Sequence, residues 1–301
     1  MRGSTSAPTV RVLDVLELLA RPGNERLRFS DVARELDLTQ ATAHAILKTL
    51  TDRGWVARDP DGKAFSLGPV LAAVAARAEA VRPLSGLALA RARELARRTG
   101  YPTTIVERVN DTLVISAPET VTDEQFPVFP GDRIPYALPF GVAFAAWDAP
   151  EEQSAWIRRS PVTDPVVIDR IDAVLARTRD RGYDIDRATP ALARATQLVG
   201  TLERDGLPAH VRQIMDQLMA ECASIIFLPD DDPANRTHPI ATLSAPVFDH
   251  RHRVALLLAV NPMRALTAAQ LSTLRSELVE AAGEISASAA PDWPAPVSNV
   301  R

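Results

Sequence analysis

The sequence predicts an α+β protein in which a small helical N-terminal domain with a β-hairpin precedes a larger domain of mixed strands and helices. Three observations lead to this fold class. Apolar residues recur at helical spacing in three short segments before residue 54, a strand–turn–strand pattern follows, and beyond Pro83 strand patterns alternate with helix patterns. The 301 residues are enough for two domains that each bury a core.

Three helices are expected near the N-terminus, and each carries an apolar stripe on one face. Ser30 and Thr39 have side chains suited to capping the second and third helix, and Gly54 suits the end of the third. The residues that should face the core are Val12, Val15, Leu16 and Leu19 in the first helix, Val32, Ala33 and Leu36 in the second, and Ala43, Ile46, Leu47 and Leu50 in the third.

A β-hairpin should follow the third helix, because strand-like residues 55–58 and 64–67 flank the turn-forming residues 59–62. Three helices and a hairpin make a winged helix-turn-helix. The Ala-rich segment that follows is expected to be a linking helix, which Pro83 interrupts. We therefore expect a winged helix-turn-helix in residues 1–68, a linker helix in 69–83, an α/β domain in 84–286 and a disordered Pro- and Ala-rich tail in 287–301.

The larger domain should form a sheet covered by helices. Strands rich in β-branched residues and helices with apolar stripes alternate along it. We expect helices at 84–99, 140–147, 151–158, 166–181, 190–203, 208–221 and 267–286, and strands at 103–109, 112–117, 125–129, 224–228, 240–248 and 254–260.

Composition excludes several classes of protein. The single cysteine, Cys222, cannot form an intramolecular disulfide, and no signal peptide or long uncharged apolar run is evident, so we expect a cytoplasmic protein outside the membrane. No nucleophile elbow, phosphate-binding Gly-rich loop or metal-ligand set is recognisable, so we expect no catalysis, cofactor or metal. His250 and His252 have a spacing that could bind a metal, but we favour exposed turn residues.

The run FSDVARELDLTQATAHAILKTLTDRGWVARDPDGKAFSLGPVL, residues 29–71, resembles the IclR family of winged-helix regulators. The segments GDRIP (131–135), RGYDID (181–186) and ATLSAPVFDHRHRVALLLAV (241–260) resemble the effector-binding domain of that family. The resemblance implies a GAF-like effector-binding domain, a transcriptional regulator that acts as a repressor on a double-stranded DNA operator, and a homodimer or dimer of dimers. Asp37 stands where a glycine is usual in the turn, a position that Asp can fill because it reaches the left-handed region.

A winged helix reads DNA because its third helix fits the major groove, where side chains meet base edges and capping groups meet phosphates. The net charge of −4 means that a small part of the chain must supply the contacts. The alternative is a solvated helix face that binds protein instead. The residues expected to contact DNA are Thr39, Gln40, Ala41, Thr42, His44 and Lys48 in the helix and Arg58 and Lys63 in the wing.

The larger domain is expected to bind a small-molecule effector, a hydrophobic or carboxylic acid metabolite, in an apolar cavity with an arginine as counter-charge. The alternative for the apolar residues is ordinary core packing, and the alternative for the domain is a ligand-independent role in oligomerisation or protein binding. The residues expected at the ligand are Arg133, Tyr136, Leu138, Phe140, Trp147 and Cys222.

Overall fold

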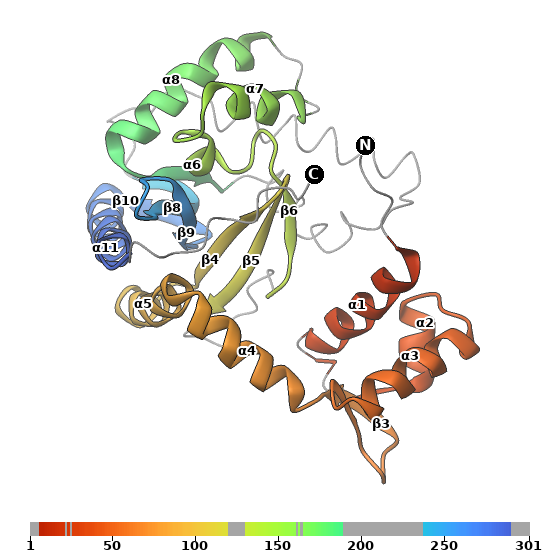
Figure 1. The fold of residues 1–301 in the computed structure, drawn as a ribbon. Helices are drawn as coiled ribbons and strands as arrows, with labels where there is room; N and C mark the ends of the chain where they lie inside the picture. Colours follow the sequence, from red (N-terminus) through yellow and green to blue (C-terminus); the bar gives the residue numbers. More distant parts are fainter. Residues whose placement is uncertain are drawn as a thin grey trace. The chain divides into compact units, whose positions relative to one another are not determined.

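A computed structural model gives the structure of the chain. It describes residues 6–21, 23–24, 26–119, 130–160, 162, 165–188 and 237–289. The chain divides into two compact units, Met1–Arg82 and Pro83–Arg301 (Figure 1). The division lies beside the proline at which the sequence pattern changes, and the expected tail lies almost wholly outside the described residues.

The first unit is a winged helix-turn-helix, as the sequence predicts. Its three short strands form an antiparallel sheet in the order β1-β3-β2, and apolar stripes of the helices meet in one core that includes Val15, Val32 and Leu47. The elements are α1 (Ala7–Ala20), β1 (Leu27–Arg28), α2 (Phe29–Glu35), α3 (Gln40–Asp52), β2 (Val56–Arg58), β3 (Ala64–Leu67) and α4 (Val70–Val81).

The two expected helix caps have different outcomes. Thr39 is the N-cap of α3, and its hydroxyl accepts a hydrogen bond from the Thr42 amide, so that prediction is confirmed. The prediction for Ser30 is wrong, because α2 already begins at Phe29 and the Asp31 carboxylate accepts the Arg28 amide at 3.0 Å instead. The turn between these helices contains Asp37 at φ +49°, the left-handed conformation expected there.

The second unit contains one seven-stranded antiparallel sheet. Six strands follow the order β10-β8-β9-β4-β5-β6, and the seventh strand, β7, also pairs with β8. The elements are α5 (Pro83–Thr99), β4 (Thr103–Val109), β5 (Thr112–Glu119), β6 (Arg133–Pro135), α6 (Val142–Ala145), α7 (Pro150–Arg158), α8 (Pro165–Arg181), β7 (Asp184–Arg187), β8 (Thr237–Phe248), β9 (Val254–Val260), β10 (Arg264–Thr267) and α11 (Ala268–Ala287).

Most elements expected in the described part of this unit are present. The structure also contains three short strands that were not expected, β6, β7 and β10, and α6 is shorter than the helix predicted over 140–147. The strand expected at 125–129 and the elements expected between 190 and 228 lie outside the described residues.

Helices pack on both faces of this sheet, because its central strands are apolar on both sides. Leu256 and Leu258 of β9 face a core formed with α5 and α11. The intervening Leu257 belongs to a second core, which contains residues of α6, α7 and α8. This second face also holds the cavity described below.

The segment between β6 and α6 turns tightly at Gly141, which has φ +81° and stands directly before α6. A Cβ atom at this position would lie 2.7 Å from Cδ2 of the Tyr136 ring and 3.2 Å from the Leu113 side chain. Tyr136 is fully buried, so its ring has no free space into which to move. Only glycine therefore fits here.

We predict that Gly141→Ala lowers the free energy of unfolding by at least about 2 kcal/mol, because it combines a left-handed backbone with overpacking. Gly283→Ala is the matched control, since Gly283 is exposed within α11 and an added Cβ meets nothing within 4 Å. That control should be neutral or stabilising by up to about 1 kcal/mol. Chemical denaturation measures both, and an equal effect of the two substitutions would contradict the packing argument.

Candidate nucleic-acid interface and ligand cavity

Helix α3 presents one face to the core and leaves the opposite face exposed. Ala43, Leu47 and Leu50 are buried, as expected from their helical spacing. The exposed face carries residues spaced three or four apart, which places them side by side along the helix. This exposed set is Gln40, Ala41, His44, Ala45, Lys48 and Asp52.

The N-terminus of α3 combines free backbone amides with two hydroxyl groups. The hydroxyl oxygens of Thr39 and Thr42 lie 2.9 Å apart, and Thr39 is exposed. The first turn of a helix also carries the positive end of the helix dipole. This arrangement is suited to an anion such as a backbone phosphate.

The basic residues expected at the interface are all exposed, but one of them has an acidic neighbour. Lys48 forms an ion pair with Asp52, four residues later on the same face of α3. In the wing, the guanidinium carbon of Arg58 lies 5.7 Å from the centre of the Phe65 ring, and Lys63 sits in the turn at φ +52°. An exposed i,i+4 ion pair contributes only about 0.3 to 0.5 kcal/mol, so Lys48 can exchange Asp52 for a phosphate at small cost.

The second unit contains a cavity of about 860 Å³, a volume that includes its opening to solvent. It lies on the α6 face of the sheet, and strands β4, β5, β6, β7, β8 and β9 all contribute to it. Most of the wall is apolar, which suits burial of an apolar ligand body. The apolar side chains of the wall include Val106, Leu113, Ile115, Ile134, Phe140 and Leu257.

One side of the cavity carries two carboxylates. Asp184 and Asp186 alternate with Ile185 along β7, so they point to the same face of the sheet while Ile185 packs toward the opposite core. In the register of β7 and β8, Asp184 pairs with Ser244 and Asp186 with Thr242. The hydroxyls and the carboxylates therefore form one polar strip along the wall.

Asn261, which follows β9, extends this polar strip to a third strand. Its side-chain carbonyl oxygen accepts a hydrogen bond from the Thr242 hydroxyl at 3.0 Å. The Asn261 amide donates to the Pro102 carbonyl and to the Thr104 hydroxyl, at 3.2 Å each. The amide protons of Asn261 are therefore used within the wall.

Burial shifts both carboxyl groups toward their neutral form. Desolvation, together with the charge of Asp184, raises the pKa of Asp186 to about 8. Desolvation also raises the pKa of Asp184, although a hydrogen bond from Thr178 and the charge of Arg177 act in the opposite direction. The raised pKa of Asp186 favours one proton on this pair near neutral pH.

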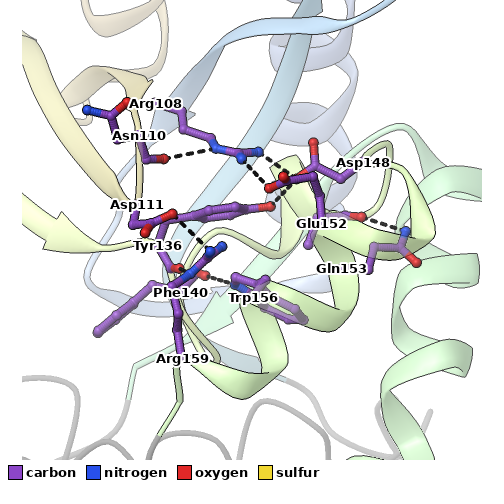
Figure 2. A network of polar contacts seen from close by, with 11 residues as sticks. Arg108, Asn110, Asp111, Tyr136, Phe140, Asp148, Glu152, Gln153, Trp156 and Arg159 are labelled. Atoms are coloured by element: carbon purple, nitrogen blue, oxygen red, sulfur yellow. Dashed lines mark hydrogen bonds and ion pairs between the residues drawn. The ribbon is translucent and has the colours of Figure 1, made fainter. Parts of the chain in front are cut away.

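A polar network fixes the segment that closes the opposite side of the cavity (Figure 2). The Tyr136 hydroxyl donates to Asp148 Oδ2 at 2.6 Å, and Arg108 of β4 donates to the same oxygen at 2.6 Å. Arg108 also reaches Glu152 of α7 at 2.8 Å. Desolvation and the Asp148 charge raise the pKa of Tyr136, so the phenol remains a donor.

The Tyr136 ring lies between two guanidinium groups, those of Arg108 and Arg159, whose central carbons are 4.2 and 5.2 Å from the ring centre. Arg159 also donates to the Tyr136 carbonyl at 2.8 Å. Close by, the Trp156 indole donates to the Phe140 carbonyl at 2.7 Å. These contacts hold the backbone on which Phe140 and Gly141 line the cavity.

The structure separates the residues expected at the ligand. Phe140 lines the cavity, but Tyr136 and Leu138 are fully buried in the core beside α6, and Trp147 packs edge-on against Phe248 at 5.5 Å between ring centres. Arg133 lies in β6 opposite Val114 and does not line the cavity, so the expected counter-charge for an acid is not found there. Cys222 lies outside the described residues.

Sequence reasoning missed the polar strip on β7, β8 and β9. The motif that carries Asp184 and Asp186 was recognised only as a family resemblance. The available signal was the alternation of two acidic residues around Ile185, which places both carboxylates on one face if the segment is a strand.

His250 and His252 occupy the turn between β8 and β9, as favoured from the sequence, but His250 is half-buried and not exposed as expected. His252 is exposed at φ +57° and its amide donates to the Asp249 carbonyl at 2.9 Å. Within the described residues there is no group of three side chains that could hold a metal ion. In the same part of the chain, none of the helices combines the length and apolar character needed to cross a membrane.

We predict that Asp186→Asn stabilises the protein in a pH-dependent way. The native state binds the Asp186 proton more tightly than the unfolded state, so native stability falls as pH rises from about 4, the ordinary pKa, to about 8. Asparagine cannot ionise, so the variant should gain at least about 1 kcal/mol over the native chain at pH 8 and little at pH 4. Asp169→Asn, on the exposed face of α8, is the control. A pH-independent difference in chemical denaturation would refute the raised pKa.

Comparison with known proteins assigns the chain to a family. The family model of the IclR helix-turn-helix domain matches residues 8–60. The glycerol operon regulatory protein of Streptomyces coelicolor is 31% identical over 181 residues, which cover 58% of this chain and 71% of that protein. The HTH-type transcriptional regulator BhcR of Paracoccus denitrificans is 26% identical over 294 residues, which cover 93% of this chain and 86% of that protein.

Solved structures share the fold of both units. An IclR transcriptional regulator from Alicyclobacillus acidocaldarius has a TM-score of 0.61 at 20% identity, covering 94% of this chain and 99% of that one. An IclR homolog from Microbacterium hydrocarbonoxydans, complexed with 4-hydroxybenzoate, has a TM-score of 0.56 at 19% identity, covering 93% and 98%. These relatives confirm the prediction of a regulator and not an enzyme. The chain belongs to the IclR family of DNA-binding transcriptional regulators.

Proposed function

We propose that the chain is a repressor that binds a DNA operator through α3 and the wing, and that a small molecule in the cavity of the second unit controls this binding. The observation that carries the proposal is the combination of an exposed polar face on α3 with a cavity in the other unit. Each feature serves one half of a ligand-controlled switch.

The exposed face of α3 offers both kinds of contact that DNA recognition needs. Gln40 can pair with an adenine edge in the major groove, while His44 lies one turn further along the same face. Thr39 and Thr42, with the backbone amides beside them, can hold a phosphate. Lys48 of α3, and Arg58 and Lys63 of the wing, are proposed to contact the backbone, and Ala41 to allow close approach to the groove.

Ligand control is supported by the cavity itself, which is lined by side chains from six strands and by a segment that a polar network holds in place. The relative complexed with 4-hydroxybenzoate has the same fold, which supports a small organic ligand for this architecture. A preformed cavity binds with little loss of conformational entropy.

We further propose that the chain acts as a homodimer or a dimer of dimers, because closed symmetric oligomers are the usual form of soluble homo-oligomers and dimeric winged helices read two half-sites. Repression can be tested with a reporter placed behind the operator. Expression should rise when the regulator is removed.

We predict that Asp52→Ala strengthens DNA binding and that Lys48→Ala weakens it. Asp52 neutralises Lys48 and adds a negative charge to the DNA-facing side of α3, so its removal should raise affinity about 3- to 10-fold at low salt. Lys48→Ala should reduce the salt slope by about 1 on operator and scrambled duplexes alike. Gln40→Ala should instead weaken the preference for a particular base pair at one position of the operator. Asp169→Ala controls for net charge, and identical affinities for Asp52→Ala and Asp169→Ala would refute the assigned face.

We predict a two-fold symmetric operator. Footprinting should show an inverted repeat whose half-site centres lie about 10 base pairs, or a multiple of that, apart, because the spacing follows the helical repeat of DNA. Sedimentation at micromolar concentration should show a dimer or larger assembly. A monomer that protects one asymmetric site would contradict the proposal.

A further inference from the structure

The cavity of the second unit presents hydrogen-bond acceptors to its occupant. Among the described residues that line it, Asp184 and Asp186 are the only charged ones. Both lie on the same side of the cavity, and their cross-strand neighbours on β8 are Ser244 and Thr242. A ligand that enters the cavity therefore meets negative charge and no lining cation in this part of the chain.

The hydrogen bonds within the wall increase this preference. Thr242 donates its hydroxyl proton to Asn261, so toward the cavity its oxygen can only accept. The Asn261 amide donates to the Pro102 carbonyl and the Thr104 hydroxyl, so it has no proton left to offer. The side chains of Thr242 and Asn261 therefore offer only acceptors to a ligand, while the carboxyl groups of Asp184 and Asp186 remain the charged groups of this wall.

The two carboxylates differ in their polar contacts. The Asp186 carboxylate forms no hydrogen bond or ion pair with the described residues, although it lies against an otherwise apolar cavity. Asp184 differs, because it accepts from Thr178 at 3.4 Å and feels the positive charges of Arg177 and Arg181 from α8. A half-buried carboxylate without a partner is unfavourable, and a bound donor would relieve that condition.

The opposite wall has a different character. Val106, Leu113, Ile134, Phe140 and Leu257 provide apolar surface from four strands and from the segment before α6. A suitable ligand thus needs an apolar body as well as a donor end. The two parts must be close together, because the carboxylates and the apolar wall belong to one cavity.

We propose that the effector is a small amine with an apolar body, whose ammonium group is bound between Asp184 and Asp186, and not a carboxylic acid. This inference rests on the proposed ligand control and names the chemical class of ligand for that same cavity. The ammonium donates to the two carboxylates, and the apolar body packs against Phe140 and the strands β4, β5 and β9. A carboxylate in the same place would lie against the negative charge that the pair retains.

The raised pKa of Asp186 supports this ligand class. A proton occupies the carboxyl pair in the empty cavity near neutral pH, and an ammonium group replaces that proton when it binds. Affinity for a permanently charged amine should therefore rise between pH 6 and pH 8, and binding should release a proton. The charged groups that act on the pair from the described elements are Arg177 and Arg181 of α8.

The test uses calorimetry on the full chain with three matched probes: phenethylamine, 2-phenylethanol and phenylacetate. The amine should bind most tightly and the acid least, with at least about a tenfold difference between these two. Asp186→Asn should weaken the amine about tenfold or more and leave the alcohol within about threefold. Asp184→Asn provides a second variant of the pair, and Asp169→Asn on α8 is the control that should change none of the three.

Measurement of operator affinity in the same samples separates this inference from the proposed function. Amine binding that leaves operator affinity unchanged supports the ligand class and counts against ligand control. Release of the operator by phenylacetate but not by phenethylamine supports ligand control and overturns the ligand class. Equal losses of affinity for all three probes in Asp186→Asn would also overturn the ligand class, and so would no binding of the amine at millimolar concentration. Operator affinity measured without probes tests the DNA-binding function separately. The thermal unfolding of each variant shows that it is folded.

Discussion

The cavity depends on one carboxylate, that of Asp148, which binds the Tyr136 hydroxyl and the Arg108 guanidinium at the same oxygen. Arg108 belongs to β4, and Tyr136 begins the segment that leads to α6, so this contact joins the sheet to the wall opposite the two aspartates. A charge-assisted hydrogen bond in a half-buried place is stronger than one at the surface. Because Phe140 and Gly141 are only a few residues away, this anchor helps to fix their positions at the cavity.

The DNA-binding unit could be predicted from the sequence almost completely, because its structure is set by local signals. The stripe of Ala43, Leu47 and Leu50 fixes which face of α3 is buried, and the Thr39 cap fixes where the helix begins. The exposed face is then determined without knowledge of the rest of the chain. Two local features were missed: strand β1, and the start of α2, where Arg28 is the N-cap in place of Ser30 and the Asp31 side chain accepts the Arg28 amide.

The cavity could not be predicted in this way, because its parts meet only through the sheet. Strand β7 has only four residues, so its alternation is too short to identify a strand, and only its pairing with β8 brings Asp186 opposite Thr242. Among the aromatic residues expected at the ligand, Phe140 lines the cavity, whereas Tyr136 and Trp147 do not. Tyr136 was expected at the ligand because it is large and amphipathic, yet its ring is buried between two guanidinium groups and its hydroxyl is used by Asp148. A buried tyrosine with a satisfied hydroxyl is a structural residue.

The raised pKa of Asp186 means that its ionised form is unfavourable in the folded unit, and this bears on how a ligand can act. Asp186 lies against apolar side chains without a partner among the described residues, so the unit is less stable than it would be with a neutral residue there. Local rules of this kind are broken most often where function requires it. A ligand that supplies positive charge removes the unfavourable term in addition to making its own contacts, so its binding stabilises the liganded state more than contact area alone would indicate.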